Sequence, residues 1–103
     1  MAEIEKLTRE LVAIPSHADE TAAGDYIEQW LREETTGRIE RDSHGNVIGR
    51  RGSGEQSLAL VGHHDVVPPD GNQVDGDSYR VERQSERLYG RGAADMKGAV
   101  AAA

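Results

Sequence analysis

An apolar run that leads directly into metal-binding side chains constrains this fold more than any other feature. Residues 58–61 are continuously apolar and lie between polar segments, a pattern that predicts a buried central β-strand. His63 and Asp65 follow within a few residues. Because ligands bind beyond the carboxyl ends of strands in open α/β sheets, we expect these two side chains to lie at a binding edge.

Amphipathic patterns predict helices ahead of this strand. Residues 3–14 carry apolar side chains at helical spacing, and Pro15 ends that pattern. A second helix is predicted from a polar start, with Ser16 or Asp19 as its cap, to about Glu34.

Short extended segments and a last helix complete the predicted order. Residues 37–40 and 46–50 flank a turn and predict a hairpin, residues 79–82 and 87–89 predict a strand pair, and an alanine-rich helix is predicted from Met96. The order helix, helix, strands and helix predicts a layered α/β domain within residues 1–103.

Composition narrows the possible functions and ligands. The net charge of −7 argues against nucleic acid, whose phosphates require lysine and arginine. We expect no membrane span, because no apolar run approaches 18 residues. Without cysteine, any metal must be held by histidine and carboxylates. The start lacks the pattern of a secretory signal, so we expect a cytoplasmic protein.

The local geometry of His63, His64 and Asp65 selects one histidine. Residues i and i+2 of an extended segment point to the same side, so His63 and Asp65 share a face while His64 points away. A carboxylate beside a ligating imidazole can accept its free ring N–H and fix its orientation. The alternative is a loop histidine that merely pairs with its neighbour.

Asp95 is the second acidic residue of interest. It follows a glycine-containing loop and precedes a predicted helix, so it suits either a helix N-cap or a bridge between two metal ions.

Other polar residues are expected to have no part in the site. Lys97 and Arg91 lie near Asp95 in the sequence, and we expect them at the helix start or the surface. His17 and His44 are expected to be exposed in turns. The acidic loop of residues 70–77 lacks the ligand spacing of a calcium loop and is interpreted as solvated.

Residues 62–69 and 88–98 closely resemble two signatures of a dinuclear zinc hydrolase family. This family includes succinyl-diaminopimelate desuccinylase, acetylornithine deacetylase, aminoacylase and the glutamate carboxypeptidases. The resemblance extends to residues 11–16 and to the turn at residues 42–46, and so covers almost the whole chain.

The resemblance implies the N-terminal part of a layered zinc-exopeptidase-like catalytic domain. It implies two divalent ions, zinc or cobalt, with His63 binding one ion, Asp95 bridging the pair and Asp65 orienting His63 as a catalytic group. It also implies a cis peptide bond between Asp95 and Met96. The expected reaction is hydrolysis of amide bonds in N-acyl amino acids or small peptides, with a leaning to desuccinylase or deacetylase chemistry in amino-acid biosynthesis.

The family places a catalytic glutamate pair, further ligands and a lid or dimerisation domain beyond the signatures. The one adjacent glutamate pair here, Glu33 and Glu34, precedes His63 and cannot take that part by order. The loop between the signatures, residues 70–78, lacks the aromatic residue that is usual in the family, and we expect Tyr79 to take its place. Because zinc usually takes about four ligands, we expect the chain alone to be inactive and to bind zinc poorly.

The alternative function is a non-catalytic remnant that acts as a binding or pairing module. Homodimerisation is possible in the family.

Overall fold

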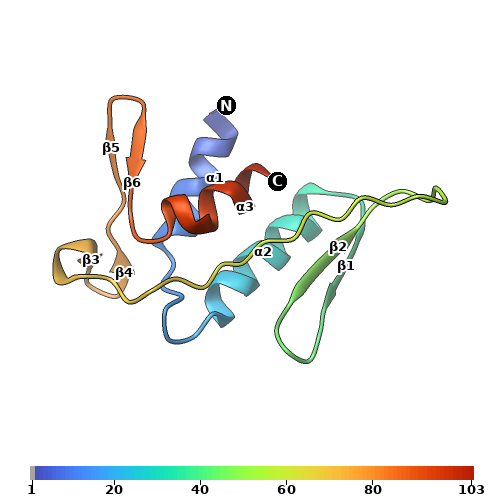
Figure 1. Cartoon of the computed structure of the whole chain (residues 1–103), viewed down its shortest axis with the longest axis horizontal. Coiled ribbons are helices and arrows are strands. Elements are labelled where there is room, and N and C mark those ends of the chain that lie inside the picture. The colour runs from blue at the N-terminus through green and yellow to red at the C-terminus, as the bar shows by residue number, and fades with distance from the viewer. Residues whose placement is uncertain (1) are drawn as a thin grey trace.

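Two amphipathic helices open the chain and contain most of its buried side chains. The computed structural model describes residues 2–103 and begins with α1 (Ala2–Ala13) and α2 (Thr21–Glu34) (Figure 1). Leu11 and Val12 of α1 and Ala23 of α2 are buried. Both helices lie where the periodicity predicts them.

The start of α2 is capped differently from the prediction. Glu20 occupies the N-cap position and makes no side-chain capping bond. Asp19, one of the two predicted caps, accepts the Thr21 backbone N–H at 2.9 Å. Ser16, the other, is buried and bonds elsewhere, so it does not cap this helix.

An antiparallel hairpin follows α2, as predicted. It consists of β1 (Arg38–Arg41) and β2 (Val47–Arg50), with Arg41 opposite Val47. The turn is organised by Asp42, whose Oδ1 accepts the backbone N–H groups of His44 at 2.9 Å and Asn46 at 2.8 Å. Such local bonding is the reason that aspartate favours turns.

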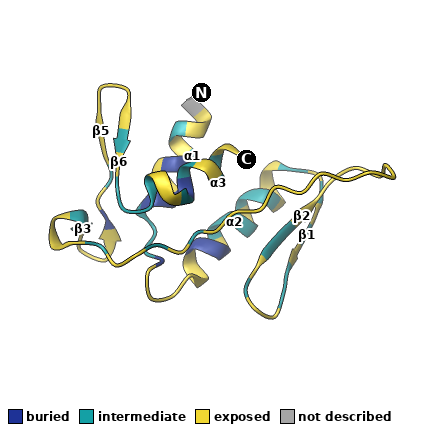
Figure 2. Ribbon diagram, viewed as in Figure 1, coloured by how far each residue is buried: buried dark blue, intermediate teal, exposed yellow. Residues whose placement is uncertain are grey.

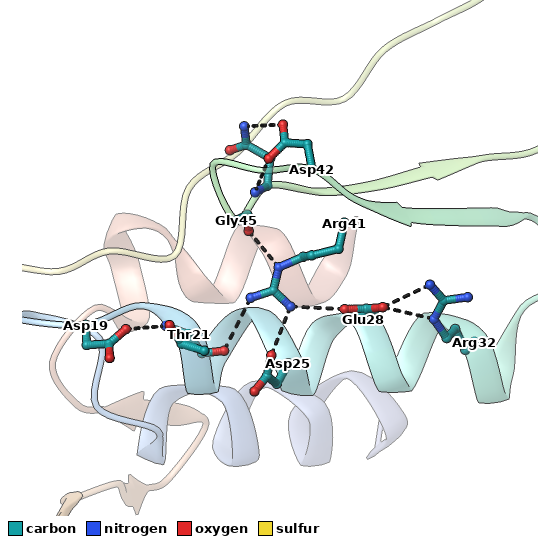
Figure 3. A network of polar contacts seen from close by, with 9 residues as sticks. Asp19, Thr21, Asp25, Glu28, Arg32, Arg41, Asp42 and Gly45 are labelled. Atoms are coloured by element: carbon teal, nitrogen blue, oxygen red, sulfur yellow. Dashed lines mark hydrogen bonds and ion pairs between the residues drawn. The ribbon is translucent and has the colours of Figure 1, made fainter.

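Arg41 fixes this hairpin to α2 (Figure 3). Its Nη1 donates to Asp25 and to Glu28, each at 3.0 Å, and its Nε donates to the Gly45 carbonyl at 2.9 Å. A Cβ on Gly24 would lie 2.5 Å from Arg41 Nη2, so the glycine makes room for the guanidinium group. One arginine therefore joins the helix, the strand and the turn.

Two further hairpins are short. The first, preceded by the 3₁₀ turn η1 (Gly71–Gln73), consists of β3 (Val74–Asp75) and β4 (Ser78–Tyr79). The second consists of β5 (Glu82–Gln84) and β6 (Arg87–Tyr89). The predicted strand pair therefore exists but begins at Glu82, and Tyr79 belongs to the earlier hairpin.

The predicted central strand at residues 58–61 is wrong for this structure. The segment is extended but unpaired: none of the backbone–backbone hydrogen bonds within residues 2–103 involves residues 51–69. Leu58 and Val61 are each 89% exposed, and the segment crosses the molecule in yellow in Figure 2. A central strand needs partners on both edges, and the described strands all pair in separate two-stranded sheets.

The last helix begins later than predicted. A π-helical turn, η2 (Ala93–Lys97), precedes α3 (Gly98–Ala102). Asp95 and Met96 have non-helical backbone angles, so regular α-helix cannot begin at Met96.

The described residues therefore form a mixed α and β structure without the predicted layers. Three separate hairpins surround the helices, and the molecule measures 48 × 32 × 21 Å. None of the helices within residues 2–103 has the length and apolar character needed to cross a membrane.

Candidate functional site

Two glycines allow the His63 segment to pack against the Asp95 segment. A Cβ on Gly62 would lie 3.1 Å from both Met96 Cε and Val100 Cγ2. A Cβ on Gly92, which has a left-handed φ of 83°, would lie only 2.3 Å from Val66 Cγ1. These close approaches flank His63 on both sides in the sequence, so they bring its side chain to Asp95.

His63 lies between the two aspartates. Its Nδ1 is 2.9 Å from Asp65 Oδ1 and 3.2 Å from the Asp65 backbone carbonyl, and the contact with hydrogen-bond geometry is the one to the carbonyl. Its Nε2 is 3.1 Å from Asp95 Oδ1. The structure thus brings together all three predicted site residues, with His63 as the common partner.

The surroundings of His63 favour its protonated form. Desolvation lowers the pKa of His63. The hydrogen bond to the Asp65 backbone, the negative charge of Asp65 and the carboxylate of Asp95 all raise this pKa, and together they outweigh desolvation. The net pKa of His63 is raised above its ordinary value. Two carboxylates around one imidazole make a site of negative potential, which suits a cation.

His64 points away from the site, toward α2. It is half-buried, and its Nδ1 lies 3.4 Å from Glu20 Oε1. Burial lowers the pKa of His64 below its ordinary value, although Glu20 opposes this effect. The two neighbouring histidines therefore differ in environment, with only His63 facing the aspartates.

Asp95 is not the N-cap of the last helix. Lys97 occupies that position in α3, and Asp95 has the extended angles φ −129° and ψ 91°. Its peptide bond to Met96 is cis, as the resemblance implies. The Asp95 side chain is 88% exposed, which leaves its second carboxylate oxygen open to a ligand.

The donor set fits part of a divalent metal site. Ligands bound to zinc at about 2.0–2.2 Å in tetrahedral geometry lie about 3.3–3.6 Å apart. His63 Nε2 and Asp95 Oδ1, at 3.1 Å, approach that separation. Within residues 2–103, no group of three or more histidine or acidic side chains is arranged to hold a metal ion. The pair is therefore a partial ligand set.

A buried polar group beneath the site was not predicted from the sequence. Lys97 lies at the start of α3, one of its two expected places, but it is fully buried, and its Nζ donates to the Ile14 carbonyl at 2.7 Å. Burial lowers the pKa of Lys97 to about 8. Tyr79 is also buried and accepts hydrogen bonds from the loop after α1. Hydrophobic periodicity cannot reveal such residues, because Tyr79 lies in a strand of only two residues and Lys97 lies in an irregular helical turn.

The other residues considered from sequence lie outside this group. His44 is exposed in the hairpin turn, as predicted. His17 is exposed too, yet its Nδ1 contacts the Tyr79 hydroxyl. Arg91 donates to Gln73 Oε1 at 2.7 Å and does not contact the two aspartates.

Comparison with known proteins gives a consistent set of relatives. Residues 59–103 match the model of peptidase family M20/M25/M40. The chain is 42% identical to a succinyl-diaminopimelate desuccinylase of Sphingopyxis alaskensis, over 94% of the chain and 28% of the relative. It is 38% identical to a succinyl-diaminopimelate desuccinylase of Xylella fastidiosa, over 99% of the chain and 28% of the relative.

A third relative is an acetylornithine deacetylase of Vibrio parahaemolyticus, which is 43% identical over 58% of the chain and 16% of the relative. The chain thus spans about 28% of the length of the first relatives it matches. The family match covers the segments that carry His63 and Asp95. The chain is therefore similar to peptidase family M20/M25/M40 over residues 59–103, and to succinyl-diaminopimelate desuccinylases over nearly all of its own length.

Proposed function

We propose that this chain contributes part of the metal centre of an amidohydrolase acting on N-acyl amino acids or small peptides. The observation that carries the proposal is the contact of His63 with Asp65 and with Asp95, which come from two separate segments. The names of the relatives favour desuccinylase or deacetylase chemistry on small amino-acid derivatives.

In this proposal, His63 and Asp95 would hold a pair of divalent ions, zinc or cobalt, and the Asp95 carboxylate would be shared between them. When bound, such ions polarise an amide carbonyl and make water a stronger nucleophile. Asp65 keeps the His63 ring oriented through Nδ1, which leaves Nε2 free to ligate. A neutral imidazole is needed for ligation, so the site must release the extra proton that the two carboxylates favour.

The remaining ligands and the general base would come from other parts of the family's domain. A zinc site needs about four ligands, and His63 with Asp95 supplies two of them. Those other parts of the domain would also supply strands that pair with residues 58–61, and so would build the layered sheet. This proposal explains why Leu58, Leu60 and Val61 are apolar although all three are exposed here.

The test is metal-dependent hydrolysis by the natural gene product. Release of succinate or acetate from N-succinyl-diaminopimelate and N-acetylornithine is measured with added zinc or cobalt, and again after chelation. We expect activity that depends on metal and is abolished by His63→Ala and by Asp95→Ala. His44→Ala and Asp77→Ala are the matched controls, because both side chains are exposed and neither belongs to either signature.

The second function, a non-catalytic pairing module, is favoured by the exposed apolar residues of the 58–61 segment. A natural product that hydrolyses neither substrate, with any metal, and that associates through this segment would support the second function and exclude the first.

A further inference from the structure

A connector after α1 contacts both segments of the candidate metal centre. The connector, residues 14–17, begins the link from α1 to α2 and contains one buried residue, Ser16. The Ser16 hydroxyl donates to the His64 backbone carbonyl at 2.6 Å. From the other segment, Lys97 Nζ donates to the Ile14 carbonyl at 2.7 Å. His64 directly follows His63, and Lys97 is two residues after Asp95. Each of the two segments is therefore hydrogen-bonded to the connector close to its proposed metal ligand.

Tyr79 holds the connector in place between these two ties. Its hydroxyl accepts the backbone N–H groups of Ser16 at 3.0 Å and His17 at 3.1 Å. The Lys97 ammonium lies 5.2 Å from the centroid of the Tyr79 ring. Cation–π contacts at this range strengthen when they are withdrawn from water. Ser16, Tyr79 and Lys97 are all buried, so the three residues form one packed polar unit.

The direct contact between the two proposed ligands is weaker than this buried unit. The His63 and Asp95 side chains are 45% and 88% exposed. Exposed ion pairs contribute little to holding two segments together, because water and salt screen them. Buried hydrogen bonds are costly to break, since a partner left behind stays desolvated. The connector therefore has more influence on the separation of the two segments than the ligand pair has.

We propose that Ser16 and Lys97 are positioning residues that set the distance between His63 and Asp95 through the 14–17 connector. Ser16 acts on the His63 segment through the His64 carbonyl, and Lys97 acts on the Asp95 segment. Neither residue touches the metal or the substrate. This inference rests on the proposed function for its consequence, which is metal affinity, but its structural part is measurable without metal.

Ser16→Ala is the informative variant, and Thr8→Ala is its matched control. Thr8 is also buried and also donates its hydroxyl to a backbone carbonyl, that of Ile4 at 2.7 Å, but within α1. Two readouts on the 103-residue chain separate the roles. The first is the nuclear Overhauser contact between the His63 ring and the Asp95 side chain in the metal-free protein. The second is the zinc dissociation constant from the shift of the His63 ring resonances.

We expect Ser16→Ala to lose the His63–Asp95 contact and to raise the zinc dissociation constant about three- to tenfold, the effect of one buried hydrogen bond. Thr8→Ala should lower thermal stability while leaving both readouts unchanged. Lys97→Met removes the hydrogen bond that holds the Asp95 segment, so it should likewise lose the His63–Asp95 contact and raise the zinc dissociation constant. This variant replaces Ser16→Ala in the test if Ser16→Ala does not fold.

Retention of the contact in Ser16→Ala and Lys97→Met would overturn the inference, and so would equal loss in Thr8→Ala. Because two ligands bind zinc poorly, lack of zinc binding by the unsubstituted chain would leave the metal-free contact to decide the positioning role. The proposed function fails separately, if the natural gene product shows no metal-dependent hydrolysis.

Discussion

At the scale of single residues, glycines shape the site as much as the proposed ligands do. Gly92 combines a left-handed φ with a position where any side chain would strike Val66. Glycine permits such a close backbone approach because it has no side chain. The neighbour that makes the approach necessary lies 26 positions earlier in the chain and could not be read from the pattern.

Gly92→Ala should destabilise the chain by about 2–4 kcal/mol, since it adds overlap with Val66 to a strained φ. Gly45→Ala is the matched control, because its φ of 92° is similar and no atom lies within 4 Å of the added Cβ. The control should cost only about 1–2 kcal/mol, from the backbone angle alone. Urea unfolding measures both, and equal losses would show that contact with Val66 is unimportant.

Glu28 makes the stability of the α2–hairpin contact dependent on pH. Hydrogen bonds from Arg32 and then Arg41 lower the pKa of Glu28 below its usual 4.5. A lowered pKa in the folded state means that the stabilisation is complete above the unfolded-state pKa and is lost as pH falls through the folded-state value. Glu28→Gln should therefore reduce the free energy of unfolding at pH 7 and change it little at pH 2.

Urea unfolding at the two pH values gives this comparison. Glu34→Gln, at the exposed end of the same helix, serves as the control and should change stability little at either pH. If Glu28→Gln reduced the free energy of unfolding by the same amount at both pH values, the role assigned to the charge of Glu28 would be contradicted.

At the scale of elements, local signals predicted α1, α2 and two of the three hairpins, but neither the β3–β4 hairpin nor the tertiary role of residues 58–61. The helices follow from spacing within about 14 residues, and the β1–β2 hairpin follows from the turn chemistry of Asp42. The 58–61 strand depends instead on partners elsewhere, and no described strand lies against it. Its composition fits a buried strand, but composition alone does not supply a neighbour.

A pair of leucine substitutions distinguishes the packed element from the unpaired one. Leu11→Ala, which truncates a side chain 1% exposed in α1, should cost about 2–5 kcal/mol of stability. Leu58→Ala, at a side chain 89% exposed, should change it by no more than about 0.5 kcal/mol. Thermal or urea unfolding measures both. A comparable loss in Leu58→Ala would show that the 58–61 segment is packed in solution.

At the scale of the whole molecule, the described chain combines a small packed centre with a long unpaired segment. Its radius of gyration is 14.4 Å, whereas a compact domain of this length has about 13 Å. The sequence predicted the three site residues and their grouping through two motifs. It did not predict that a connector after α1 would contact both motifs, because that arrangement depends on packing between distant segments.

Amide hydrogen exchange tests this division of the molecule. Backbone amides of residues 51–61 should exchange almost as fast as in an unfolded chain, because they make no backbone hydrogen bonds in the structure. Amides in the middle of α1 and α2 should be protected. Protection of residues 58–61 equal to that of the helices would show that this segment forms a paired strand in solution.

His63 and Asp95 are proposed to act together as ligands of a divalent ion. The most direct measurement is a zinc titration of the 103-residue chain followed by the ring resonances of its four histidines. Because two ligands bind zinc poorly, we predict weak but saturable shifts at His63 that disappear in Asp95→Ala, while His17 and His44 respond little. Shifts that are equal at all four histidines, or that persist unchanged in Asp95→Ala, would contradict the claim.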